Sequence, residues 1–184
     1  MDTDQRVVFI RKWLKRANQA DDVFDCFFSA WIALVVAAQR LRTASGRHVD
    51  DDSDRNKVVD YFKANTALII PLLEERENEM RQLARRKGSR YGSPIHDTGN
   101  YQLREAFRRL SRFYMDGEDL SEAERSATLA SLVNKVWNNV FHGVKVYDDA
   151  EDQEVLTLVN PILLQIVETC ERQADQTLSS SSRT

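Results

Sequence analysis

The chain has 184 residues, of which 42% are hydrophobic and 30% are charged, and its formal net charge is −3 at pH 7. This length fits one domain, and the composition is typical of a soluble helical protein. The longest apolar stretch, residues 30–38, is too short to span a membrane, and the acidic start lacks the features of a secretion signal. We therefore expect a cytoplasmic protein without a membrane partner.

Apolar residues spaced three and four apart predict helices, and no alternating run predicts a strand. The first helix is expected over residues 6–18. The second, over residues 23–42, is expected to begin at a cap formed by Asp21 or Asp22. Its middle is apolar on nearly every side, which predicts the most buried helix of the fold.

Two further helices are expected next. Ser53 and Asp54 open the first of them, and Asn65 or Thr66 ends it or caps its successor. The successor runs towards Arg86. Pro71 either kinks this helix or marks its true start.

Residues 87–100 hold three of the chain's six glycines and one proline, so we expect a long loop there. Loops of this length are more often functional than simple connectors. His96 and Asp97 form a catalytic pair by residue type, although an exposed loop histidine is the more common situation. His48 lies in another polar loop, where nothing indicates a ligand.

The helix expected over residues 101–114 carries Arg104, Arg108 and Arg112 at a spacing of four, with Arg109 beside them. Arginines stacked without acidic partners repel one another, so this stripe suits either a solvated face or a polyanion. Between residues 81 and 112 the chain has nine Lys and Arg against two acids. This asymmetry predicts a basic surface on an otherwise acidic domain.

A capping box formed by Ser121 and Glu124 begins the helix of residues 123–142. One face of this helix is apolar and is expected to be buried. A second face is polar and presents Ser131, Lys135, Asn138 and His142.

The polar face has the groups needed for RNA cleavage. An imidazole can act as general acid or base, a cation can stabilise charge on a phosphate, and an amide can orient either group. The alternative is that His142 caps the helix C-terminus, with Gly143 as a left-handed stop. By spacing alone the capping role is favoured.

The last helix is expected over residues 151–173, with a kink at Pro161. Together these elements predict one helical domain over residues 1–175, followed by a disordered Ser-rich tail over residues 176–184. The two cysteines, Cys26 and Cys170, lie among apolar neighbours and have no metal-ligand or disulfide spacing, so we expect buried structural thiols. We expect no metal and no other cofactor.

The stretch W-N-N-V-F-H-G-V-K, at residues 137–145, resembles the signature of HEPN domains (the higher eukaryote and prokaryote nucleotide-binding superfamily). In that signature an Arg is followed after four to six residues by a His, and several subfamilies read close to R-N-N-L-F-H-G-x-K. The residues that match this form are Asn138, Asn139, Phe141, His142, Gly143 and Lys145. Looser similarity extends over residues 23–170 and includes an aromatic-rich early helix at residues 28–34.

One position departs from the family pattern. Trp137 stands five residues before His142, where the family has its Arg, and helical spacing places Trp137 on the apolar face. Lys135 lies within the permitted spacing and on the face of His142. A Lys can supply the cation, although it lacks the guanidinium fork.

The resemblance implies an all-α bundle of about five to seven helices, dimeric through the helix of residues 134–143, that cleaves RNA without a metal. It implies a toxin or an effector of antiviral or CRISPR-associated defence, with an antitoxin as a candidate partner protein. His142 would be the general acid and base, Asn138 its orienting partner and Lys135 the phosphate cation. The residues expected to bind RNA are Arg104, Arg108, Arg112 and Lys145.

Trp137 supports a second hypothesis, in which the chain is a catalytically inactive HEPN module that binds RNA or a partner protein. A scaffold or a bundle that binds a small ligand remains a third possibility, because one fold serves many functions.

Overall fold

The computed structural model describes residues 3–46, 53–85, 101–141 and 150–181. These residues form helices and no strand, which confirms the prediction of an all-α bundle. In chain order the helices are α1 (Thr3–Asn18), α2 (Val23–Ala44), α3 (Asp54–Ala64), α4 (Thr66–Glu75), α5 (Glu77–Arg85), α6 (Tyr101–Asp116), α7 (Glu122–Phe141) and α8 (Ala150–Ser181).

The helix starts follow the capping signals in the sequence. Asp22 caps α2, and its Oδ1 accepts hydrogen bonds from the amides of Phe24 and Asp25 at 2.8 and 3.1 Å. Ser53 caps α3 through the amide of Asn56. These side chains satisfy amides that have no partner inside the helix.

The capping box at the start of α7 forms as the sequence predicts. The Ser121 amide donates to Glu124 Oε2 at 3.0 Å, and the Glu124 amide donates to Ser121 Oγ at 3.3 Å. Two otherwise unpaired amides are satisfied reciprocally, so the first turn of α7 is fixed by local sequence.

The eighth helix arises because the segment expected as one helix from Thr66 towards Arg86 is divided at Arg76. Arg76 ends α4, and its guanidinium donates to Gln165 on α8 at 3.0 Å and pairs with Glu79 at 3.1 Å. Pro71 lies inside α4 and does not start it. The tertiary contact with α8 accompanies a break for which local sequence has no Gly or Pro signal.

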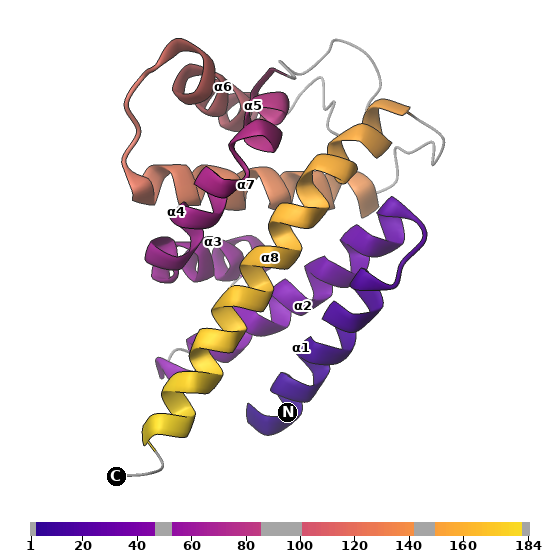
Figure 1. Cartoon of the computed structure of the whole chain (residues 1–184), viewed down its shortest axis with the longest axis vertical. Coiled ribbons are helices and arrows are strands. Elements are labelled where there is room, and N and C mark those ends of the chain that lie inside the picture. The colour runs from indigo at the N-terminus through magenta and orange to yellow at the C-terminus, as the bar shows by residue number, and fades with distance from the viewer. Residues whose placement is uncertain (1–2, 47–52, 86–100, 142–149, 182–184) are drawn as a thin grey trace.

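Helix α2 lies at the centre of the fold and packs against α1, α3 and α8 (Figure 1). By length and composition it is apolar enough to cross a membrane, but most of its apolar window is buried inside the bundle. Phe27, Trp31 and Leu34 are each exposed by 2% or less. This burial makes α2 a core helix of the bundle.

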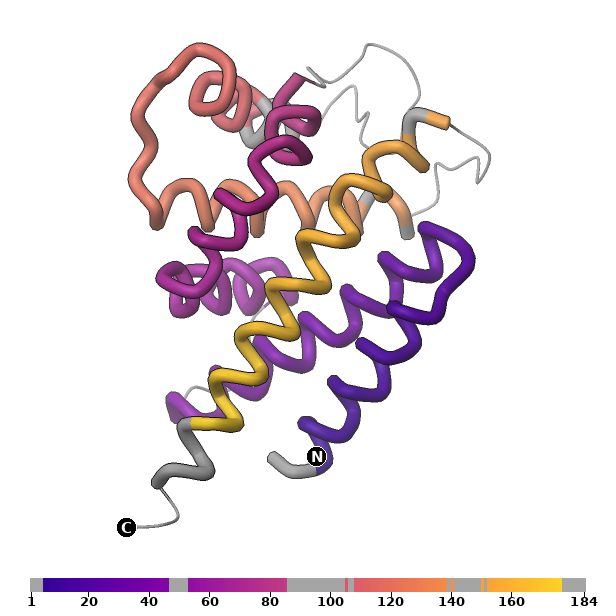
Figure 2. The backbone as a smooth tube through the Cα atoms, viewed as in Figure 1, coloured from indigo at the N-terminus to yellow at the C-terminus, as the bar shows by residue number. Residues whose placement is uncertain are grey.

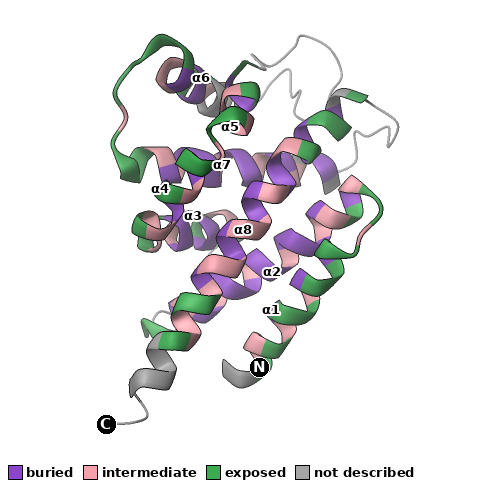
Figure 3. Cartoon of the chain, viewed as in Figure 1, coloured by how far each residue is buried: buried purple, intermediate pink, exposed green. Residues whose placement is uncertain are grey.

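Helix α8 runs diagonally across α2, and α7 crosses behind it, so the chain forms two layers of crossing helices (Figures 1 and 2). The sides that face between these helices are buried (Figure 3). Pro161 lies inside α8, as the sequence predicts. The helix continues to Ser181, whereas the sequence predicts a disordered tail from residue 176.

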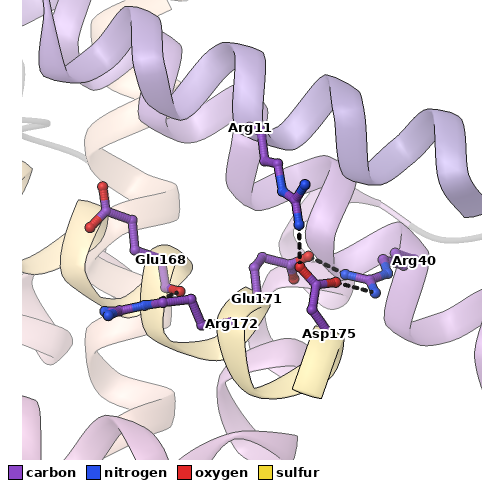
Figure 4. A network of polar contacts seen from close by, with 6 residues as sticks. All are labelled: Arg11, Arg40, Glu168, Glu171, Arg172 and Asp175. Carbon is purple, nitrogen blue, oxygen red and sulfur yellow. Dashed lines mark hydrogen bonds and ion pairs between the residues drawn. The ribbon is translucent and has the colours of Figure 1, made fainter. Parts of the chain in front are cut away.

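Ion pairs between charged side chains connect α8 to α2 and α1 (Figure 4). Arg40 contacts Glu171 at 2.5 Å and Asp175 at 3.2 Å, and Arg11 contacts Asp175 at 2.8 Å. The side chains of Arg40 and Glu171 are only 8% and 12% exposed. Burial raises the pKa of Glu171, and the adjacent Arg40 guanidinium opposes that rise.

Cys170 lies beside these ion pairs and is buried, while Cys26 is half-buried. Burial raises the pKa of the Cys170 thiol to about 12, and it also raises the pKa of Cys26. Both cysteines are free thiols. For Cys170 the prediction of a buried structural thiol is confirmed, because so high a pKa leaves little reactive thiolate.

Candidate functional site

Helix α7 has the apolar face that its sequence predicts. Five of its aliphatic residues are at most 8% exposed and face the core, namely Leu129, Leu132, Val133, Val136 and Val140. The helix packs against α3, α4 and α6. This packing fixes the rotation of α7 and therefore the direction of its remaining side chains.

Trp137 belongs to an aromatic cluster on α2. Its ring lies 5.0 Å from that of Trp31, with planes inclined by 13°, and 5.8 Å from that of Phe28. Stacked pairs of this kind contribute about 0.5–1.5 kcal/mol beyond the burial of area. Position 137 is therefore a packing position in this chain.

Lys135 and Asn138 are half-buried on a different face of α7. Because they are three residues apart on a helix, their side chains are neighbours. The hydroxyl of Ser131, also predicted on this face, donates to the carbonyl of Ala127 at 2.9 Å. Lys135 and Asn138 are thus the members of the predicted catalytic group that the structure brings together.

The remaining members of the group lie at or beyond the end of the described helix. Helix α7 is described as far as Phe141, the residue before His142. His142 and Lys145 lie outside the described residues, as do His48, His96 and Asp97.

The structure also identifies Asn134, one turn before Asn138, as a polar residue inside the apolar face. It is 2% exposed, and its Nδ2 has no hydrogen-bond partner in the described part of the chain. A buried polar group left unpaired costs about 1–3 kcal/mol, so Asn134 is a candidate for supporting the site. A polar residue within a run of aliphatic ones is the sequence signal that marks it.

The arginine stripe on α6 differs from the expectation of unpartnered cations. Glu105 binds Arg108 at 2.9 Å and Arg109 at 3.2 Å, and Glu118 lies 3.5 Å from Arg112. Hydrogen bonds from Arg108 and then Arg109 lower the pKa of Glu105. The expectation was wrong because one carboxylate three and four residues away serves two arginines. Of Arg104 only the backbone is described.

Metal ligands do not gather in the described ranges. Within residues 3–46, 53–85, 101–141 and 150–181, no group of three or more His, Cys, Asp and Glu side chains is placed to hold a metal ion.

Comparison of the chain with protein-family models, with curated proteins and with solved structures finds no match.

Proposed function

We propose that the chain is a HEPN-like endoribonuclease that cleaves RNA without a metal. The observation that carries the proposal is the arrangement of α7. Lys135 and Asn138 share a half-buried face of the helix that leads directly to His142, while Trp137 packs in the aromatic cluster. The resemblance of residues 137–145 to the HEPN signature agrees with this arrangement.

The proposed reaction uses the RNA's own 2′-hydroxyl as nucleophile. His142 accepts its proton as the 2′-oxygen bonds to phosphorus. The protonated His142 then donates that proton to the 5′-oxygen as the bond from phosphorus to the 5′-oxygen breaks. Lys135 stabilises the charge on the phosphate oxygens, and Asn138 orients His142 or the ribose hydroxyl. The products are a 2′,3′-cyclic phosphate and a 5′-hydroxyl.

The proposal includes a homodimer in which the segments of residues 134–143 from two copies face each other. Val136 and Val140 are buried within one copy, so the contact would use the side of α7 that carries Lys135 and Asn138. A second copy would close the site against water and bring two histidines together. A role as a toxin or as an antiviral or CRISPR-associated effector in the cytoplasm belongs to the same proposal and follows from the resemblance.

Trp137 favours a second candidate function, a catalytically inactive HEPN-like module that binds RNA or a partner protein such as an antitoxin. Its stacking against Trp31 and Phe28 leaves no guanidinium at the motif position. A Lys offers a point charge without the bidentate fork, so Lys135 replaces the Arg incompletely.

Lys135 distinguishes the two candidates. If it is the phosphate cation, Lys135→Ala should lower the rate of RNA cleavage in EDTA by about 10²–10³-fold, as for the loss of other groups that stabilise transition-state charge. Lys135→Arg should retain most of the rate. Lys63→Ala is a matched control, because it removes an exposed Lys from α3, which belongs to neither proposed site.

The result that would contradict the proposal is RNA cleavage by Lys135→Ala at the wild-type rate. Binding of RNA by the wild-type chain without any cleavage would favour the inactive module. Circular dichroism of each variant would show whether the helices are retained.

A further inference from the structure

Three cations near the end of α1 differ from most other arginines and lysines described. Lys12, Lys15 and Arg16 are exposed, and none forms an ion pair with a described residue. Arg16 lies over the indole of Trp13 at 5.2 Å. By contrast, Arg108, Arg109 and Arg112 on α6 have carboxylate partners. These three cations therefore lack the ion pairs that the three arginines of α6 form.

These cations help to line a surface depression of about 480 Å³ between the end of α1 and the start of α2. We call it the α1–α2 depression. Its volume falls within the range of small-ligand sites, about 300–1,000 Å³.

The turn and the start of α2 contribute acidic residues to the lining of the α1–α2 depression, namely Asp21, Asp22 and Asp25. Asp22 is already engaged by the amides of α2, and Asp25 lies in the first turn, where the helix dipole favours a carboxylate. A mixed lining fits a ligand with an anionic group at one end and N–H or O–H donors at the other. A nucleotide has both, because carboxylates accept hydrogen bonds from base amino groups.

A series of aromatic contacts leads from the α1–α2 depression to Trp137, on the packed face of α7. From the Arg16 guanidinium the steps are 5.2 Å to Trp13, 5.9 Å to Phe28 and 5.8 Å to Trp137. Trp137 adjoins Asn138 in sequence. Single-stranded RNA sites commonly cover about 4–16 nucleotides, so one strand can contact both places.

We propose that the α1–α2 depression binds a nucleotide of the single-stranded RNA that reaches the α7 site. Lys12, Lys15 and Arg16 contact phosphates, and the aspartates accept hydrogen bonds from the base or ribose. The inference rests on the proposed function for its choice of ligand. On this inference the principal phosphate-binding surface is formed by the cations of α1, and not by the arginines of α6.

The test measures the affinity of a short single-stranded RNA by fluorescence anisotropy in EDTA, on a His142→Ala background so that binding is measured without cleavage. Lys12→Gln, Lys15→Gln and Arg16→Gln are combined in one variant. The matched control combines Arg108→Gln, Arg109→Gln and Arg112→Gln. A second variant with only the two lysines changed avoids the contact between Arg16 and Trp13.

The α1 variant should lose at least about tenfold in affinity, and its salt slope should fall by about 0.7 for each phosphate contact removed. The double-lysine variant should show a smaller loss of the same kind, and the α6 variant should stay near the parent. Unchanged affinity in both α1 variants would overturn the inference, as would an absence of RNA binding by the parent.

The outcomes for this inference and for the proposed function are separable. If the wild-type chain binds RNA through the α1 cations but never cleaves it, the nuclease proposal is contradicted. The inference that the α1–α2 depression binds RNA is then still supported. Wild-type cleavage that is unaffected by the α1 substitutions would support the nuclease and contradict the inference.

Discussion

At the scale of single residues, Trp137 carries the most information. It stands where the HEPN signature, which residues 137–145 resemble, has an Arg, and it stacks on two aromatic rings of α2. The sequence predicts its apolar placement correctly, because helical spacing aligns Trp137 with Val133 and Val140. The identity of its neighbours does not follow from spacing, since Trp31 and Phe28 come from a helix more than 100 residues earlier.

Truncation of Trp137 should measure this packing role. We expect Trp137→Ala to lower the free energy of unfolding by about 2–4 kcal/mol, near the lower end for large aromatic residues because Trp137 is half-buried. Trp137→Phe should cost less, since it keeps a stacking ring. Urea denaturation followed by circular dichroism would give both values, and equal losses in the two variants would argue against stacking.

At the scale of helices, the sequence predicts most starts and ends because caps and apolar spacing are local signals. The capping box of α7 and the cap of α2 are examples. The break at Arg76 is not predicted, because its accompanying contact reaches Gln165 on α8. The charge balance of α6 was misjudged for a different reason, since Glu105 lies within the helix and pairs with both Arg108 and Arg109.

The attachment of α8 gives a prediction at this scale. Arg40→Ala should lower the free energy of unfolding by about 3–5 kcal/mol at neutral pH, because it leaves the Glu171 carboxylate buried without its cation. Arg11→Ala is the matched control, because its ion pair with Asp175 is exposed and should contribute at most about 1 kcal/mol.

The loss caused by Arg40→Ala should depend on pH. Without Arg40, burial raises the folded-state pKa of Glu171 further above its unfolded value. The variant is then most stable below the unfolded pKa and loses stability as pH rises through the folded pKa. The difference from wild type should therefore widen between about pH 4 and pH 7, in urea denaturation at a series of pH values. A difference that narrows with rising pH would contradict a buried Glu171 charge.

At the scale of the whole molecule, the all-α fold follows from sequence, but the distribution of charge does not. Counting residues 81–112 predicts a basic surface, yet ion pairs neutralise much of its described part. At the end of α1, Lys12, Lys15 and Arg16 form no ion pair with a described residue, although three aspartates line the same depression. Which cations remain unpaired depends on contacts such as that of Arg11 with Asp175, between opposite ends of the chain.

The candidate site is predictable from sequence only in part. Some of its features follow from the spacing of residues within one helix, and others depend on how helices pack together. Lys135 and Asn138 share a face through helical spacing, which sequence specifies directly. Asn134 was missed because its burial depends on how α7 packs against other helices. The α1–α2 depression was missed because it forms where two helices meet.

The central claim is that the polar face of α7 cleaves RNA without a metal, and one measurement tests it most directly. Wild type and His142→Ala are incubated with a mixed-sequence RNA in EDTA, and the products are analysed for 2′,3′-cyclic phosphate ends. We predict cleavage by wild type and its loss in His142→Ala, with the helical content of both proteins unchanged. Equal cleavage by both proteins, or none by either, would contradict the claim.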